Sequence, residues 1–320
     1  MNPNAKLADR ARNLWGLRHA KEPIAIDYLG KFLIGIHEGK HPASNALLQH
    51  EAAYCLGQSK NLRALDILEQ VIDDKEHCAI VRHEAGEALA ALASPNQPQN
   101  QRIIDILSRN IDTDVIELKE TCSLGVERVQ FLNSAEFKDI ENPYPDTIDP
   151  APSFLPGSHS PQELRDIMLD ESKDLFTRYR ALFSLRNLTY LKEGRAKKDT
   201  DQAGVLLSEG LFAKGSALLR HEVAFVLGQI GMPVTYENLC KALRTTTEHE
   251  MVRHEAAEAL GTVLGNATEA GLDEIKEKVD AILKEYLKDD AQVVRESCVL
   301  ALDVADYVSG DNFQYVSVPA

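Results

Sequence analysis

The stretch HEAAYCLGQ, at residues 50–58, returns three more times along the chain with the same pattern of small and large side chains. The related copies are HEAGEALAA at 83–91, HEVAFVLGQ at 221–229 and HEAAEALGT at 254–262. The apolar residues of each copy lie at positions i, i+1, i+4 and i+5, which form one face of an α-helix. The four copies therefore predict four equivalent amphipathic helices.

Four weaker copies keep this spacing and lengthen the array. They are ARNLWGLRH at 11–19, KETCSLGVE at 119–127, YRALFSLRN at 179–187 and RESCVLALD at 295–303. Further helical patterns, such as NLRALDILEQVIDD from Asn61, lie between the copies. Two helices in a period of about 40 residues resemble HEAT repeats, whose helical hairpins bury their apolar faces by stacking. We therefore expect an all-α fold, a HEAT-repeat (α-α superhelix) solenoid of eight helical hairpins.

A proline-rich stretch interrupts the array once. Six of the 13 prolines lie between Pro143 and Pro161, and proline removes a helical hydrogen-bond donor, so this stretch is not helical throughout. The copies at 50 and 83 return at 221 and 254, both displaced by 171 residues. This indicates two pseudo-symmetric halves of four repeats; the alternative is one continuous solenoid with a loop insertion. The predicted divisions are N-terminal repeats 1–135, a linker 136–161, C-terminal repeats 162–310 and a tail 311–320.

Glycine recurs near the end of three copies, as Gly57, Gly228 and Gly261. Glycine inside a helix costs stability, so its recurrence at one position needs a reason. We predict that neighbouring helices approach closely there.

The histidines of these helices are the candidate functional residues. Ten occur, and six precede a glutamate, whereas chance predicts about 1.6 followed by any acid, given 50 acidic residues in 320. The pairs at His37 and His249 lie at a predicted helix end and in a predicted turn, and they are set aside. The other four occupy one position of the repeat. They are His50 with Glu51, His83 with Glu84, His221 with Glu222, and His254 with Glu255.

Equivalent positions of stacked repeats are neighbours in space, so these pairs should gather within each half. A lone helical histidine is more often structural than a ligand. Carboxylates packed together, however, repel one another and bear a desolvation cost that a bound cation removes. The flanking copies carry Lys119, Arg295, Tyr179 and Ala11 at the equivalent position. We therefore predict a metal site in the two central repeats of each half.

The ligand types narrow the choice of metal. Imidazole and carboxylate without cysteine suit iron, manganese or zinc. Two histidines and one carboxylate in each half form the facial set of non-haem iron(II) enzymes, and two such sets facing each other would make a dinuclear centre. Zinc hydrolysis is the alternative, but no GxSxG, GxxxxGK[ST] or GxGxxG motif is present to support hydrolytic or nucleotide chemistry.

The composition argues against binding to nucleic acid, against cysteine-based sites and against membrane association. A net charge of −15 argues against non-specific nucleic-acid binding and suits metal cations or a basic protein. Five cysteines without a CxxC spacing argue against disulfides or a cysteine–zinc site. No apolar run approaches the roughly 20 residues that span a bilayer, and the N-terminus lacks a signal-peptide pattern. We expect no membrane association and a cytoplasmic protein, with the nucleus as the alternative compartment.

The repeats, read together, resemble the deoxyhypusine hydroxylase family over essentially the whole chain. The resemblance rests on HEAAYCLGQ, VRHEAGEALAAL, LLRHEVAFVLGQ, MVRHEAAEALG, YRALFSLRNL and the DPAP motif at 149–152. It implies a monomeric non-haem di-iron monooxygenase with O2 as co-substrate. It further implies a protein partner, eukaryotic translation initiation factor 5A, whose deoxyhypusine side chain in a basic loop is hydroxylated to hypusine.

The resemblance also implies roles for the eight residues of the four pairs. His50, His83 and Glu84 would bind one iron, and His221, His254 and Glu255 would bind the other. Glu51 and Glu222 would lie in or next to the coordination sphere and act in catalysis by holding the ammonium and secondary amine of the substrate.

Two alternatives belong to other functional classes. The first is a non-catalytic HEAT scaffold with structural His–Glu pairs, which needs no stoichiometric iron. The second is a phycobilin-lyase-like HEAT protein, which would bind a tetrapyrrole and has no need of four repeated pairs.

Overall fold

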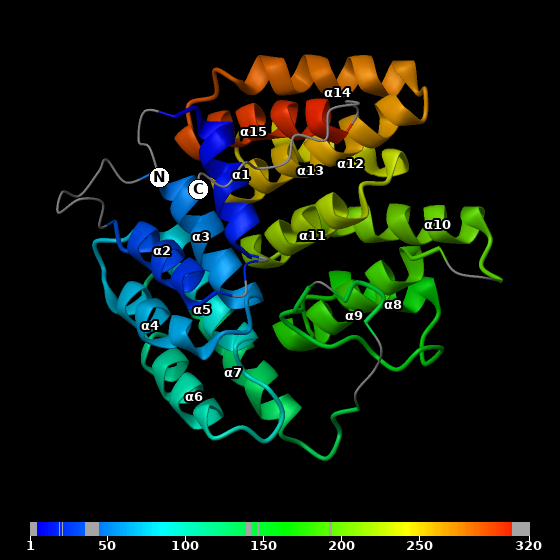
Figure 1. Cartoon of the computed structure of the whole chain (residues 1–320). Helices are drawn as coiled ribbons and strands as arrows, with labels where there is room; N and C mark the ends of the chain where they lie inside the picture. Colours follow the sequence, from blue (N-terminus) through cyan, green and yellow to red (C-terminus); the bar gives the residue numbers. More distant parts are fainter. Residues whose placement is uncertain are drawn as a thin grey trace. The chain divides into compact units, whose positions relative to one another are not determined.

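The computed structural model describes residues 5–18, 20, 22–35, 45–138, 142–145, 147–191 and 194–308. Every regular element in these ranges is a helix, which confirms the all-α prediction (Figure 1). The pair at His37 and the predicted tail 311–320 lie outside the described residues. None of the described helices combines the length and apolarity that crossing a bilayer requires.

Within the described residues, each of the eight sequence copies lies in one α-helix, with the first copy described as far as Arg18, so the predicted helix is confirmed at the copies. We call these the repeat helices. They are α1 (Leu7–Arg18), α3 (Ala46–Gln58), α5 (Ala79–Ala91), α7 (Ile116–Leu132), α9 (Leu175–Thr189), α11 (Ala217–Ile230), α13 (Glu250–Glu269) and α15 (Gln292–Val308).

The remaining α-helices alternate with the repeat helices, and each packs against the repeat helix that follows it. We call them the outer helices. They are α2 (Pro23–Leu33), α4 (Leu65–Asp73), α6 (Gln99–Arg109), α8 (Pro161–Leu169), α10 (Lys197–Ser208), α12 (Tyr236–Arg244) and α14 (Asp273–Tyr286). Within the described residues, short 3-10 helices also join these elements: η1 (Leu62–Ala64), η2 (Glu209–Phe212) and η3 (Pro233–Thr235).

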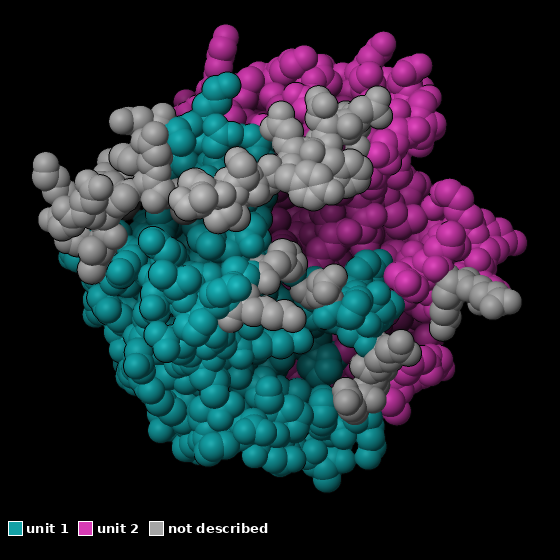
Figure 2. Space-filling model, viewed as in Figure 1, with its two compact units in different colours: residues 1–152 teal, residues 153–320 magenta. Residues whose placement is uncertain are grey.

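The chain divides into two compact units, residues 1–152 (unit 1) and 153–320 (unit 2), coloured separately in Figure 2. In unit 1, α3 packs against both α1 and α5, and α5 packs against α7. In unit 2, α11 packs against α9 and α13, and α13 packs against α15. Consecutive repeat helices are therefore neighbours within each unit, as HEAT stacking requires.

The middle of the proline-rich stretch, residues 148–151, packs against α3 and α7 of unit 1. The backbone N–H of Ile148 donates to Gln58 Oε1 at 2.8 Å, and Gln58 Nε2 donates back to the Ile148 carbonyl at 3.3 Å. Arg128 Nε donates to the Asp149 carbonyl at 2.9 Å, and Ala151 is fully buried. The DPAP motif therefore belongs to the packing of α3 and α7 and does more than tether the units.

A long polar side chain immediately before the first position of four copies fixes the hairpins. It donates to a carbonyl at the C-terminus of the preceding outer helix, where the last turn lacks intrahelical partners. The pairs are Gln49 with Leu33 (2.7 Å), Arg82 with Ile72 (2.9 Å), Arg178 with Met168 (2.9 Å) and Arg253 with Leu243 (3.1 Å). This contact fixes the position of each repeat helix along its outer helix. The histidine or tyrosine that follows is therefore placed equivalently in each of the four hairpins.

The recurring glycines lie where repeat helices touch. A Cβ atom on Gly57 would lie 2.6 Å from the Cα of Ala88, and one on Gly261 would lie 2.6 Å from the Cα of Ala301. A Cβ on Gly228 would lie 3.2 Å from the backbone of α13. The predicted close approach of neighbouring helices is thus confirmed.

Replacing Gly57 with alanine should lower the free energy of unfolding by about 1–3 kcal/mol, because the methyl group meets backbone and not a movable side chain. Gly16 in α1 is the matched control, since a Cβ there meets nothing within 4 Å. Gly16→Ala should be neutral or stabilising, because alanine favours helix over glycine. Urea unfolding measures both, and equal losses in the two variants would contradict the account.

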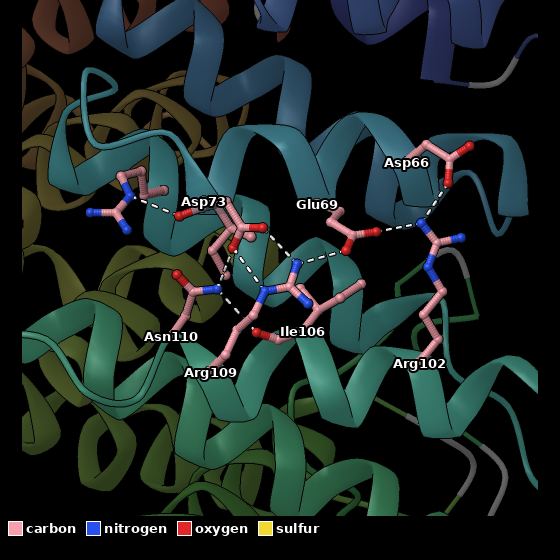
Figure 3. Close-up of polar contacts among 9 residues, drawn as sticks. Asp66, Glu69, Asp73, Arg102, Ile106, Arg109 and Asn110 are labelled. Carbon is pink, nitrogen blue, oxygen red and sulfur yellow. Dashed lines mark hydrogen bonds and ion pairs between the residues drawn. The ribbon is translucent and has the colours of Figure 1, made fainter.

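An ion-pair network joins the outer helices α4 and α6 (Figure 3). Arg102 pairs with Asp66 at 2.6 Å and also with Glu69, and Arg109 lies 2.6 Å from both Glu69 and Asp73. Burial raises the pKa of Glu69 and of Asp73, but hydrogen bonds from the arginines outweigh it and hold both pKa values below the usual range. The network therefore contributes stability mainly while these carboxylates are ionised.

Because the folded-state pKa values are lowered, this contribution is complete above the unfolded pKa of about 4 and disappears as pH falls through the folded values. Arg109→Gln should therefore destabilise the protein at pH 7, by less than about 1 kcal/mol because the groups are partly exposed, and still less at pH 3. Lys284, which pairs with Asp280 within α14, provides the control in Lys284→Gln. A larger loss at pH 3 than at pH 7 would refute this reading.

Candidate metal centre

Two neighbouring repeat helices of unit 1 bring one cluster together. His50 comes from α3, and His83 and Glu84 come from α5; all three side chains are buried. Glu84 Oε2 lies 3.1 Å from His50 Nε2 and 3.7 Å from His83 Nε2. The two imidazole centroids are 5.8 Å apart. One carboxylate thus stands between two imidazoles, as repeat stacking predicts.

Glu51 is also buried, but its carboxylate is turned toward α1. Its Oε2 accepts a hydrogen bond of 2.6 Å from Trp15 Nε1, and its Oε1 lies 3.4 Å from His50 Nδ1. Glu51 and Glu84 therefore have different surroundings, although each follows a histidine at the same position of the repeat.

The corresponding helices of unit 2 form a second cluster. Glu255 Oε2 lies 3.5 Å from His221 Nε2 and 3.9 Å from His254 Nδ1, and the imidazole centroids are 5.6 Å apart. Ligand atoms of these three residues all lie within 4.8 Å of one another. Glu222 on α11 is buried, with 1% of its surface exposed. Each unit by itself thus assembles two histidines and a shared glutamate.

A hydroxyl group from the next repeat helix supports one histidine in each unit. Thr121 Oγ1 on α7 lies 3.2 Å from His83 Nδ1, and Ser297 Oγ on α15 lies 3.4 Å from His254 Nδ1. Such outer contacts orient the ring of a metal-binding histidine. Sequence reasoning missed both residues, although they stand at the same offset in the copies at 119 and 295.

A further glutamate accompanies the second histidine of each unit. Ligand atoms of Glu87 lie within 4.8 Å of those of His83 and Glu84, and Glu258 accepts a 2.7 Å hydrogen bond from Ser297 Oγ. The sequence carried this signal too, because HEAGE and HEAAE have glutamate where HEAAY and HEVAF have an aromatic residue.

The unit 1 cluster carries an excess of acidic groups. Burial raises the pKa of Glu87 to about 8, and the charge of Glu84 adds to this. Burial lowers the pKa of His50, but the carboxylates of Glu84 and Glu51 outweigh it, so that this pKa lies well above the usual value. A divalent cation would offset the negative charge of these carboxylates, so the electrostatics favour metal binding.

The donor set fits iron. Two imidazoles and one carboxylate per unit are the nitrogen and oxygen ligands of non-haem iron(II) sites. The nearby thiol of Cys55 donates to the Leu14 carbonyl at 3.7 Å, and burial raises its pKa, so it supplies no thiolate. His249 and Glu250 are exposed at the start of α13, where His249 caps the helix, apart from the cluster.

The protein is built of stacked helical hairpins, and consecutive repeat helices carry buried histidine–glutamate sets. It is therefore a HEAT-repeat protein with two candidate metal sites. The sequence patterns of known families agree with the repeat. The family described as "HEAT repeats" matches residues 205–303, and the one described as "PBS lyase HEAT-like repeat" matches residues 48–74.

Relatives over almost the whole chain identify the family. Deoxyhypusine hydroxylase of Drosophila melanogaster is 40% identical, and the alignment covers 98% of this chain and 91% of the relative. The Homo sapiens protein of that name is 38% identical, with the same coverage of each chain. The solved structure of human deoxyhypusine hydroxylase in complex with glycerol matches with a TM-score of 0.78 and 38% identity, covering 96% of this chain and 93% of that one. The chain belongs to the deoxyhypusine hydroxylase family.

Proposed function

We propose that this protein is a deoxyhypusine hydroxylase that adds one oxygen atom from O2 to the deoxyhypusine side chain of translation initiation factor 5A. The observation that carries the proposal is the pair of buried sets of two histidines and one glutamate, found at equivalent positions of both units in a chain of this family. A non-catalytic scaffold has no use for such sets, and a tetrapyrrole-binding protein does not require them.

Each set would hold one iron ion. His50, His83 and Glu84 would be the ligands in unit 1, and His221, His254 and Glu255 would be the ligands in unit 2. Bound iron(II) would supply the activation of O2 that hydroxylation of a C–H bond requires.

The remaining residues of the site would orient the histidine rings and balance the positive charge of the substrate. Thr121 contacts Nδ1 of His83, on the opposite side of the ring from Glu84, and so orients that ring. Ser297 lies beside Nδ1 of His254, the nitrogen that also faces Glu255. Glu51 and Glu222 are buried carboxylates suited to the cationic nitrogens of the substrate, because charge-assisted hydrogen bonds are strong and directional. A buried anion that needs a cation also disfavours neutral side chains.

A hydroxylation assay tests the function. The iron-loaded, reduced protein is mixed with O2 and the deoxyhypusine form of factor 5A, and the product is analysed by mass spectrometry. We expect the mass gain of one oxygen atom on the modified residue, and none without O2, with zinc in place of iron, or with the variant His83→Ala/His254→Ala. An unchanged substrate mass with fully iron-loaded wild type would refute the proposal.

Charge should steer the encounter between the two proteins. The chain has a net charge of −15, and the proposed substrate presents a cationic side chain in a basic loop. We expect affinity to fall as salt rises from low to physiological concentration, because screening weakens attraction between opposite charges. Calorimetric titration at several salt concentrations measures this, and a constant dissociation constant would argue against electrostatic docking.

A further inference from the structure

The indole of Trp15 is directly bonded to the candidate site. Trp15 lies on α1, the first repeat helix, which packs against α3. Its Nε1–H donates to Glu51 Oε2 at 2.6 Å, a short hydrogen bond for a nitrogen donor. The chain contains one tryptophan, so this residue is also the only indole fluorophore of the protein.

This bond determines what Glu51 offers to a ligand. One carboxylate oxygen is occupied by Trp15, and the other, Oε1, lies on the His50 side, 3.4 Å from Nδ1. A neutral N–H donor stabilises the ionised carboxylate without cancelling its charge. The carboxylate of Glu51 is therefore held in place, with one oxygen directed toward the cluster. Glu84 already stands between the imidazoles. The Oε1 atom of Glu51 contacts His50 Nδ1 and, as a carboxylate oxygen with a second lone pair, suits a cation other than the iron.

The residue equivalent to Trp15 in unit 2 is not a tryptophan. Trp15 is the fifth residue of the copy that begins at 11, and Phe183 is the fifth residue of the copy that begins at 179. Phe183 is buried in α9, with the Arg186 guanidinium 4.9 Å from its ring centroid. A phenyl ring has no N–H, so Phe183 cannot make the bond that Trp15 makes. The indole is thus a specific addition and no general requirement of the repeat.

We propose that Trp15 is a positioning residue that holds Glu51 so that Oε1 receives one cationic nitrogen of the deoxyhypusine side chain. The inference rests on the proposed function. The indole bond pre-organises Glu51 for this contact. Pre-organisation lowers the free-energy cost of binding. Loss of the Trp15 bond should therefore weaken substrate affinity and leave iron binding unchanged.

Trp15→Phe tests this with little change in packing, because it copies the residue that unit 2 has at this register. Loss of a hydrogen bond to a charged group corresponds to a change of about tenfold in binding. We expect KM for the deoxyhypusine protein to rise about tenfold, with a smaller change in kcat and an unchanged iron content. In a double-mutant cycle with Glu51→Gln, the second substitution should add almost nothing, because Trp15 acts through Glu51.

The fluorescence of Trp15 provides an independent readout. A synthetic peptide that carries deoxyhypusine and lacks tryptophan should change the indole emission of the wild type on titration. The change should be absent in Glu51→Gln at peptide concentrations where calorimetry shows binding. Gly16→Ala is a matched control, because it changes the neighbour of Trp15 on α1, where a Cβ meets nothing within 4 Å, and it should keep the emission change.

The outcomes separate this inference from the proposed function. Wild type that neither hydroxylates nor binds deoxyhypusine overturns both. Active wild type with an unchanged KM in Trp15→Phe overturns the role of Trp15 alone. Loss of iron in Trp15→Phe also overturns it, because the bond would then support metal binding.

Discussion

Glu84→Gln is expected to remove the iron of unit 1 and to lower kcat by at least about 1000-fold, the scale on which loss of an essential catalytic group acts. The reason is geometric, because Glu84 Oε2 lies within 3.7 Å of a nitrogen of both His50 and His83. Glutamine keeps the size of the side chain but loses the negative charge that binds the cation. Iron analysis and single-turnover hydroxylation measure the two effects.

The other glutamates are the controls for this prediction. Glu255→Gln should remove the iron of unit 2 in the same way, because Glu255 lies between His221 and His254. Glu51→Gln and Glu222→Gln should keep both irons and weaken substrate binding instead. Equal iron loss in all four variants would show that the division between metal ligands and substrate carboxylates is wrong.

Arg253→Met is expected to produce the largest loss of stability, about 3–5 kcal/mol, because it leaves a buried carboxylate without its cation. Arg253 pairs with Asp289, and the side chains of both residues are 6% exposed. Burial raises the pKa of Asp289, but the hydrogen bonds from Arg253 outweigh it and lower that pKa below the usual value. The variant also removes the donor to the Leu243 carbonyl at the end of α12. Thermal or urea unfolding at pH 7 measures the loss.

A second substitution distinguishes the unpaired charge from lost packing. In Arg253→Met/Asp289→Leu no buried charge remains, so most of the stability should return. Lys284→Met removes a pair that is exposed within α14 and should cost less than about 1 kcal/mol. A double variant as unstable as the single one would show that packing of the arginine stem, and not the unpaired aspartate, dominates.

The fold could be predicted because one repeat pattern encodes it many times. Each copy specifies an amphipathic helix, and each glycine such as Gly57 or Gly261 marks where the next helix must approach. The repeated period then places His50 beside His83 without any knowledge of the three-dimensional structure. The proline-rich stretch was predicted as a linker from composition alone. Its packing against Arg128 and Gln58 depends on contacts far apart in sequence, which composition does not reveal.

The surroundings of the cluster were less predictable, for different reasons. Thr121 and Ser297 are small polar residues of a kind common in helices, and only their equal offset in two copies distinguishes them. Glu87 had a clear signal in the alternation of glutamate and aromatic residues, but acidic residues are frequent in this chain. Trp15 lies in a weak copy, and its bond to Glu51 follows from side-chain reach across α1 and α3, which spacing alone does not give.

The central claim is that each unit holds one iron through its own two histidines and one glutamate. The most direct measurement is the iron content of anaerobically loaded, desalted protein for wild type, His83→Ala, His254→Ala and the variant with both changes. Circular dichroism confirms that each variant is folded before the iron is counted. The account predicts two iron ions per chain in wild type, one in each single variant and none in the double variant. The same iron content in all four proteins would contradict it.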